Sequence, residues 1–187
     1  GTLLYYPDRL DSNTTAVFFY TVTGGDTAQV TISIQNQELI WFVDNDATGT
    51  VCLPSNANLG TQACPEDTLR EITGHGLSST PSIDTANDTI FIRNDGDDAP
   101  YLCGVPLESG EKIIGDGTSV AGETLASLSG VSPVNGSSLP AFSGNDPTFT
   151  DGAGSCLLIN ANNTMRGFTI GSTVSYALFS NVANIGT

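Results

Sequence analysis

Hydrophobic residues occur along this chain in short runs separated by turns rich in Asn, Gly, Ser and Thr. The clearest example is the stretch 156–181, where the runs 156–159 (CLLI), 165–170 (MRGFTI) and 176–179 (YALF) flank the turn 160–163 (NANN). These runs are too short for helices and carry β-type residues, so each predicts a strand. One such set of strands cannot bury its apolar face alone, and we expect stacked coils of a solenoid.

The same pattern recurs earlier in the chain. Apolar runs at 88–92 (DTIFI) and 111–114 (EKII) predict strands of successive coils, because Ile90 and Ile113 lie 23 positions apart. A short helix is predicted over 68–72, since Pro65 precedes it, acidic residues stand at its start and Gly74 follows it. We expect this helix to plug the first coil.

Residues 1–37 form a separate block. The runs 3–6, 16–23 and 28–34 predict three strands, and Gly24-Gly25-Asp26 predicts a hairpin between the last two. Three strands cannot close a sandwich. The predicted fold is therefore all-β: a right-handed parallel β-helix over residues 38–187, with the handedness set by the crossover rule, preceded by a small antiparallel sheet over 1–37.

Charge and composition limit the partners. The chain has 20 acidic residues against five Lys and Arg, a net charge of −15. This balance argues against nucleic acid and anionic membrane surfaces, which both require basic side chains. No run is long enough for a membrane helix, so membrane insertion is not expected. Residues 1–7 lack a signal-peptide pattern, and we expect the natural N-terminus to lie further upstream.

The cysteines indicate an oxidising compartment. Four are present, none in a CxxC pair, and the sole histidine, His75, is far from any cysteine pair in sequence. The predicted location is extracellular or at the cell surface. We favour pairing Cys52 with Cys64, which flank one loop, and therefore Cys103 with Cys156, although four cysteines allow three pairings.

Cofactors are not expected, and calcium is the only ion with candidate residues. The segment that begins at Asp44 starts like a calcium loop, but Ser55 stands where an EF-hand needs a bidentate acid. The acidic turn with Asp95, Asp97 and Asp98 offers weak calcium ligands. A solvated turn explains these residues better, because Asx side chains commonly accept hydrogen bonds from nearby amides.

No catalytic residue is assigned. A lyase needs a basic side chain beside acidic sugars, and the chain offers Lys112 and four arginines. A glycoside hydrolase needs carboxylates that converge on one groove. Asp116, Asp146 and Asp151 are candidates only because they stand next to strands, and turn positions explain them better.

Five segments together are similar to a known family. The runs 39–45 (LIWFVDN), 60–69 (GTQACPEDTL), 88–96 (DTIFIRNDG), 107–117 (LESGEKIIGDG) and 163–170 (NTMRGFTI) resemble, in this order, the opening of right-handed parallel β-helix domains in bacterial surface and autotransporter-type adhesins. Residues 1–37 resemble the C-terminal half of cadherin-like or other immunoglobulin-like repeats, or else form a β cap on the solenoid. The resemblance implies a non-enzymatic adhesin, stalk or fibre component. A fragment of a carbohydrate-active enzyme is the alternative.

Both ends of the chain are predicted to present unpaired strand edges, which recruit further strands. The expected partners are the remainder of a larger surface protein, or otherwise other copies that add strands head to tail; glycans are a further candidate. The residues expected on these edges are Leu3, Tyr5, Val30, Ile32, Ile34, Tyr176 and Leu178.

Overall fold

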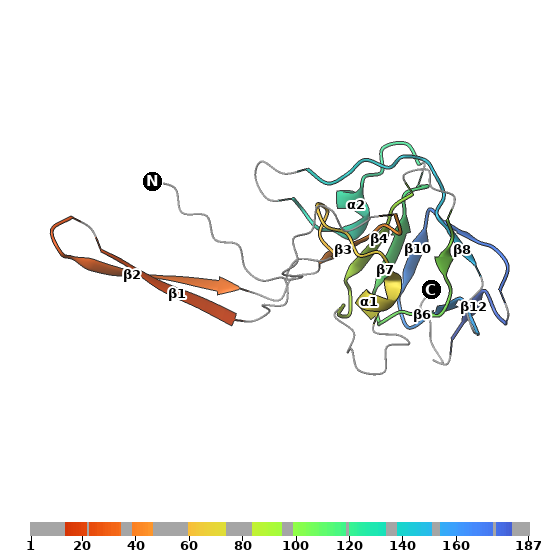
Figure 1. Cartoon of the computed structure of the whole chain (residues 1–187), viewed down its shortest axis with the longest axis horizontal. Coiled ribbons are helices and arrows are strands. Elements are labelled where there is room, and N and C mark those ends of the chain that lie inside the picture. Colours follow the sequence, from red (N-terminus) through yellow and green to blue (C-terminus); the bar gives the residue numbers. More distant parts are fainter. Residues whose placement is uncertain are drawn as a thin grey trace. The chain divides into compact units, whose positions relative to one another are not determined.

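The structure is a computed structural model that describes residues 14–21, 23–34, 39–46, 60–73, 84–94, 99–118, 120–133, 138–150, 154–173 and 175–180. The chain divides into two compact units, Gly1–Gln37 (unit 1) and Glu38–Thr187 (unit 2), shown in Figure 1. Unit 1 is the smaller and holds the first two strands, whereas unit 2 holds all the others and both helices.

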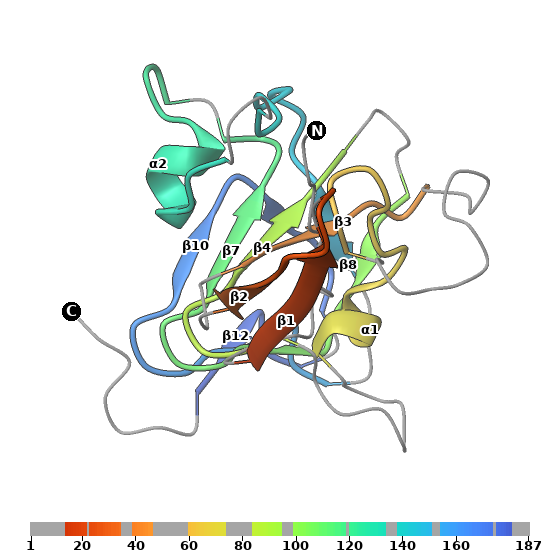
Figure 2. The ribbon, with the colours of Figure 1, turned by 90° about the vertical axis from the view of Figure 1, so that its left-hand side faces the viewer.

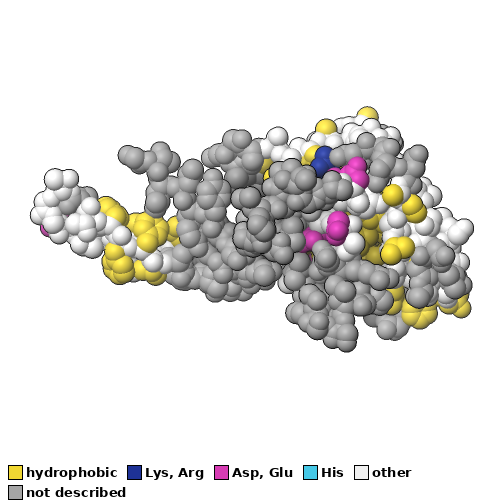
Figure 3. All heavy atoms as spheres, in the orientation of Figure 1, with side chains coloured by type: hydrophobic (Ala, Val, Ile, Leu, Met, Phe, Trp, Pro, Cys, Tyr) yellow, Lys and Arg dark blue, Asp and Glu magenta, His cyan; other side chains and the backbone are white. Residues whose placement is uncertain are grey.

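Unit 1 contains a two-stranded antiparallel sheet. Strand β1 (Thr14–Thr21) pairs with β2 (Thr27–Ile34) along its whole length. The reversal between them uses Gly24 and Gly25, whose φ angles of 126° and 94° are rarely adopted by other residues. The side chains of Val17, Phe19 and Tyr20 are exposed, and Figure 3 shows a hydrophobic patch along this hairpin. The predicted strand at 3–6 lies outside the described residues.

Unit 2 is built from short strands in three parallel sheets. The largest sheet contains β3 (Ile40–Val43), β4 (Thr89–Ile92), β7 (Lys112–Gly115) and β10 (Thr164–Arg166), in the order β10-β7-β4-β3. The second contains β5 (Tyr101–Leu102), β8 (Thr148–Thr150) and β11 (Thr169–Ile170), and the third β6 (Val105–Pro106), β9 (Leu157–Leu158) and β12 (Leu178–Phe179). From β4 onwards the chain visits the three sheets in the same order three times, which creates three rows of strands.

The prediction of an all-β, right-handed parallel β-helix preceded by an immunoglobulin-like sheet is wrong. The described residues form a two-stranded hairpin, three small separate sheets and two short helices, α1 (Leu69–Thr73) and α2 (Leu125–Ser129), and no closed solenoid. The sequence pattern predicts local strands and their parallel pairing, as in Ile90 opposite Ile113. Closure depends on the connections between sheets, and these carry no repeated pattern that could be read from the chain.

The core lies on both faces of the four-stranded sheet. On one face, Trp41, Ile90 and Ile113 belong to a cluster that also contains residues of the two smaller sheets and of α1. On the other face, Phe42, Phe91 and Ile114 contact Leu125 of α2, and Figure 2 shows α2 beside this sheet. Burial on both sides explains why β3 and β4 are apolar almost throughout, as is typical of parallel strands.

The two helices are short, and only one was expected from sequence. Helix α1 matches the predicted helix at 68–72 to within one residue, and its Leu69 and Ile72 are buried in the core. Helix α2 lies in a stretch without predicted structure. Its signals are local: Thr124 and Ser127 form a capping box, and Gly130 with φ 81° ends the helix.

Candidate functional site

The two ends of unit 2 differ in whether the outer backbone groups of their edge strands are hydrogen-bonded. At the first end, residues 60–66 cover the outer edge of β3: Phe42 N donates to Gly60 O (2.9 Å), Glu66 N to Phe42 O (2.9 Å) and Asp44 N to Glu66 O (2.8 Å). Helix α1 lies against β6, whose Pro106 has no N–H to leave unpaired. We call this the closed end; Figure 1 shows β3 and α1 together there.

At the other end lie β10, β11 and β12, which we call the open row. Each is the edge strand of its sheet, with β7, β8 and β9 as inner neighbours. Thr164 N donates to Glu111 O (3.2 Å) and Thr169 N to Pro147 O (2.9 Å), whereas Ala177 O accepts from Leu157 N (3.1 Å). All these bonds point inward.

The residues that alternate with these inward-bonded ones direct their backbone N–H and C=O groups outward. In a parallel ladder, consecutive residues direct their N–H and C=O groups to opposite sides. Met165, Ile170 and Leu178 alternate with the inward-bonded residues, so their backbone groups face away from the sheets. Among the described residues, none forms a strand outside the open row.

The open row is also apolar. Met165, Phe168 and Ile170 are half-buried and pack against the core, while Tyr176, Leu178 and Phe179 are 61%, 45% and 41% exposed. An open hollow of about 500 Å³ lies among Met165, Phe168, Ile170 and Leu178. Figure 3 shows hydrophobic side chains at the surface where β12 lies. The rings of Tyr176 and Phe179 are stacked, with centroids 5.9 Å apart.

Few charged residues lie in the open row. All 20 acidic residues lie within residues 1–151, and none follows. The one charged side chain of the open row, Arg166, is ion-paired with Glu123, with nitrogen to oxygen distances of 2.7 Å. The open row is therefore a neutral, apolar surface on a strongly acidic molecule.

The predicted assembly edges fall in three places. Leu3 and Tyr5 lie outside the described residues. Val30, Ile32 and Ile34 belong to β2 and stand opposite Phe18, Ala16 and Thr14 of β1. Tyr176 and Leu178 lie at the open row, where their side chains are exposed.

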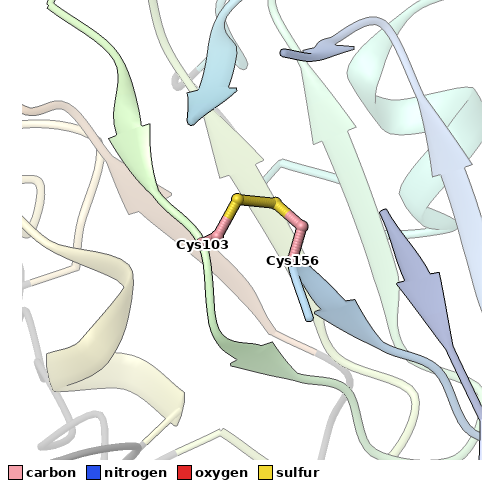
Figure 4. Close-up of a disulfide and its surroundings, with 2 residues drawn as sticks. All are labelled: Cys103 and Cys156. Carbon is pink, nitrogen blue, oxygen red and sulfur yellow. A yellow bond between two sulfur atoms is a disulfide. The ribbon is translucent and has the colours of Figure 1, made fainter. Parts of the chain in front are cut away.

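A disulfide joins two rows of unit 2. The sulfur atoms of Cys103 and Cys156 are 2.11 Å apart. Figure 4 shows the bond between Cys103, which lies between the consecutive strands β5 and β6, and Cys156, just before β9. Gly104 N and Val105 N donate to Cys156 O at 2.8 and 2.9 Å, which fixes the register beside it. Cys52 lies outside the described residues, and so does its predicted pairing with Cys64.

The predicted calcium residues give no site to describe. Asp95, Asp97 and Asp98 lie outside the described residues. Asp44 is buried and its carboxylate is 3.6 Å from Arg93 Nη1, so it serves an ion pair. In the part of the chain that the structure covers, no three metal-binding side chains come together.

Of the candidate hydrolase carboxylates, Asp116 holds a loop. Asp116 is buried, and its Oδ1 accepts from Ser143 N at 2.7 Å, which ties down the loop that leads to Asp146. Asp146 is exposed and abuts Gly117, where a side chain would collide with it. Asp151 lies outside the described residues. Lys112, the candidate lyase base, donates from Nζ to Ser129 O (2.6 Å) at the C-terminal end of α2.

Sequence reasoning missed a buried pair of carboxyl groups. Asp84 and Glu111 are 3% and 0% exposed and are hydrogen-bonded to each other, which requires a proton on one of them. Burial, followed by the bond to Asp84, raises the pKa of Glu111 to about 10, and burial raises the pKa of Asp84 to about 6. Because both groups are enclosed, this pair is structural and does not face a substrate. A lone acid between a glycine turn and an apolar strand was its only sequence signal.

A groove lies beside α2. It measures about 590 Å³ and is lined mainly by apolar residues, including Val120, Leu139 and Phe142. Among the described residues that line it, the one ionisable side chain is Glu123, which is held by Arg166. The groove therefore offers apolar contact without an acid and base pair.

Comparison of the chain with protein-family models, curated proteins and solved structures found no match. The resemblance to surface adhesins and immunoglobulin-like repeats thus stays a prediction from sequence. Neither helix in the described parts of the chain is long and apolar enough to cross a membrane.

Proposed function

We propose that this chain is a non-enzymatic extracellular structural segment, acting as an adhesin, stalk or fibre component, whose open row is completed by further β-strands. The observation that supports this most directly is the contrast between the two ends of unit 2. Residues 60–66 satisfy the edge at the closed end, whereas the outward backbone groups of the open row have no strand beside them among the described residues.

An edge of this kind favours strand addition. Unpaired N–H and C=O groups at a strand edge are templates for another strand, and exposed apolar side chains beside them favour burial against it. Natural proteins usually protect such an edge with charges or proline, as Pro106 does on β6. The described strands of the open row contain no proline, and their one charged side chain, Arg166, is neutralised by Glu123, which supports a role in which the row is covered. The covering strands come from the remainder of a larger surface protein or from other copies.

Two further observations support an extracellular role. The Cys103–Cys156 disulfide is of the kind that persists outside the reducing cytosol. A net charge of −15 keeps molecules apart laterally, and it also disfavours contact with nucleic acid or anionic lipid.

The test is a search for turnover. The purified chain is incubated with a panel of acidic and neutral polysaccharides, and new reducing ends and unsaturated sugars are measured. We expect none, because Asp116 and Lys112 are engaged in holding loops and a helix end. Binding to an immobilised glycan without turnover would favour the adhesin role.

Turnover that disappears in Asp116→Asn or Asp146→Asn would overturn the proposal in favour of a carbohydrate-active enzyme. The matched control is Asp67→Asn, because Asp67 is an exposed carboxylate elsewhere in unit 2. Turnover retained in all three variants would also overturn the proposal and would place the catalytic groups elsewhere.

A further inference from the structure

We infer that the open row pairs with the open row of a second copy, so that the chain forms a two-fold symmetric dimer through an end-to-end strand interface. This inference rests on the proposed function, in which further strands complete the open row. It adds that these strands come from a second copy of the chain.

The charge distribution selects the partner surface. With 20 acidic residues against five basic ones, most contacts between two copies bring like charges together. The stretch after residue 151 has no acidic residue, and it supplies β9 to β12. When the open rows of two copies meet, no Asp or Glu of the strands β9 to β12 lies in the contact. Arg166 does not disturb it, since Glu123 neutralises it within the same chain.

Two of the three edge strands at the closed end, β3 and β6, are blocked against a head-to-tail stack of unit 2. A stack would require the open row of one copy to pair with β3, β5 and β6 of the next. The outer edge of β3 already pairs with residues 60–66, and β6 carries Pro106 and contacts α1. Among the described residues of unit 2, only the open row therefore leaves all three of its edge strands without a covering segment or a proline. An interface between two copies of the same row is closed and gives a dimer instead of a fibre.

The strand directions allow this pairing. A two-fold axis in the plane of the open row turns one row over onto the other and reverses the strand direction, so paired strands of the two copies run antiparallel. The outward N–H and C=O groups of Met165, Ile170 and Leu178 then gain partners. The exposed side chains of Tyr176, Leu178 and Phe179 lose contact with water in the same step.

Sedimentation velocity of the full chain tests the inference. Between about 1 and 500 µM protein, in salt sufficient to screen the net charge, we expect one reversible transition from monomer to dimer. Leu178→Lys and Tyr176→Lys place cations at the interface and should each weaken the dimer at least about tenfold. Tyr176 is 61% exposed, so its replacement tests the contact without opening the core.

Leu102→Lys is the matched control, because Leu102 is an apolar residue of β5, 54% exposed, away from the open row. It should leave the dimer unchanged. Hydrogen exchange adds a local readout: the amides of Met165, Ile170 and Leu178 should exchange more slowly in the dimer than in the Tyr176→Lys monomer.

A wild-type chain that is monomeric throughout, or that grows beyond a dimer, overturns the inference; so does a dimer that Tyr176→Lys and Leu178→Lys leave intact. A monomer without polysaccharide turnover would leave the proposed function standing. A dimer that degrades a polysaccharide would overturn the proposed function alone.

Discussion

At the scale of single residues, one turn is used three times at the start of the strands of the large sheet. Asn87, Gly110 and Asn162 have φ angles of 72°, 75° and 60°. The residue after each, Asp88, Glu111 or Asn163, accepts a hydrogen bond on its side chain from the backbone N–H three positions earlier. The side chain thus closes the turn before the chain enters β4, β7 or β10.

At this turn, the effect of a substitution on stability depends on which of the three positions is changed. A Cβ at Gly110 would collide with Asn87 and would also sit at a left-handed φ. Gly110→Ala should therefore lower the free energy of unfolding by about 1–3 kcal/mol, measured by urea denaturation. Asn162→Gly, at the equivalent turn, is the control and should change stability by only a few tenths of a kcal/mol. Equal effects of the two changes would contradict this account.

The buried carboxyl pair predicts an inverted pH dependence. Burial and the bond to Asp84 raise the pKa of Glu111 to about 10, and burial raises the pKa of Asp84 to about 6. Because both values lie above those of the unfolded chain, the folded state holds the extra proton, and the pair stabilises it most at low pH. This contribution is lost as the pH rises, first through about 6 and then towards 10.

Glu111→Gln keeps the shape and a donor for Asp84 but removes the proton that titrates. It should raise the free energy of unfolding at pH 8 by on the order of 1–3 kcal/mol and leave it nearly unchanged at pH 5, by urea denaturation at both values. Asp67→Asn, at an exposed carboxylate, serves as control. A loss of stability at pH 8 in Glu111→Gln would show that the glutamate is ionised in the folded state.

At the scale of elements, the sequence was most informative where an apolar run and a turn repeat together. The strands at 88–92, 111–114 and 165–170 are visible because each follows a turn with Asn or Gly, although Gly167 splits the last run into β10 and β11. Strands β5, β6 and β8 were missed. They are two or three residues long, so no period of alternation can develop, and tertiary packing decides their state.

The candidate site was only partly predictable for a similar reason. Tyr176 and Leu178, which are predicted to lie on a strand edge, are exposed at the open row. The closed end could not be foreseen, since residues 60–66 make one isolated bridge, Val43 to Glu66, without any strand-like pattern. Tyr101 is buried, and its hydroxyl donates to Arg93 O at 2.7 Å.

The disulfide between rows predicts a large effect of its removal. Cys103 and Cys156 are 53 residues apart in sequence, and closing a loop of this length restricts the unfolded chain. The variant with both changed to Ser should lose roughly 4 kcal/mol of unfolding free energy in guanidinium denaturation. Non-reducing peptide mapping of the unmodified chain gives the control, and free thiols at both positions would contradict the bond.

At the scale of the whole molecule, charge opposes folding. Twenty acidic and five basic side chains repel one another on balance in the compact state, and salt screens this repulsion. We expect the melting temperature at pH 8 to rise by several degrees between about 10 and 300 mM sodium chloride. Near the sequence pI of about 4.1 the same addition should have little effect. A salt response that does not depend on pH would point to a cause other than net charge.

The Cys103–Cys156 bond also sets how far the molecule can be stretched. A polypeptide pulled from its two ends cannot extend the segment enclosed by a covalent cross-link, and 53 residues correspond to roughly 180 Å of extended chain. In single-molecule force spectroscopy, the oxidised chain should reach full extension shorter by this length than the same chain in reductant. In a stalk or fibre component under tension, the segment between Cys103 and Cys156 would thus not extend until the disulfide is reduced.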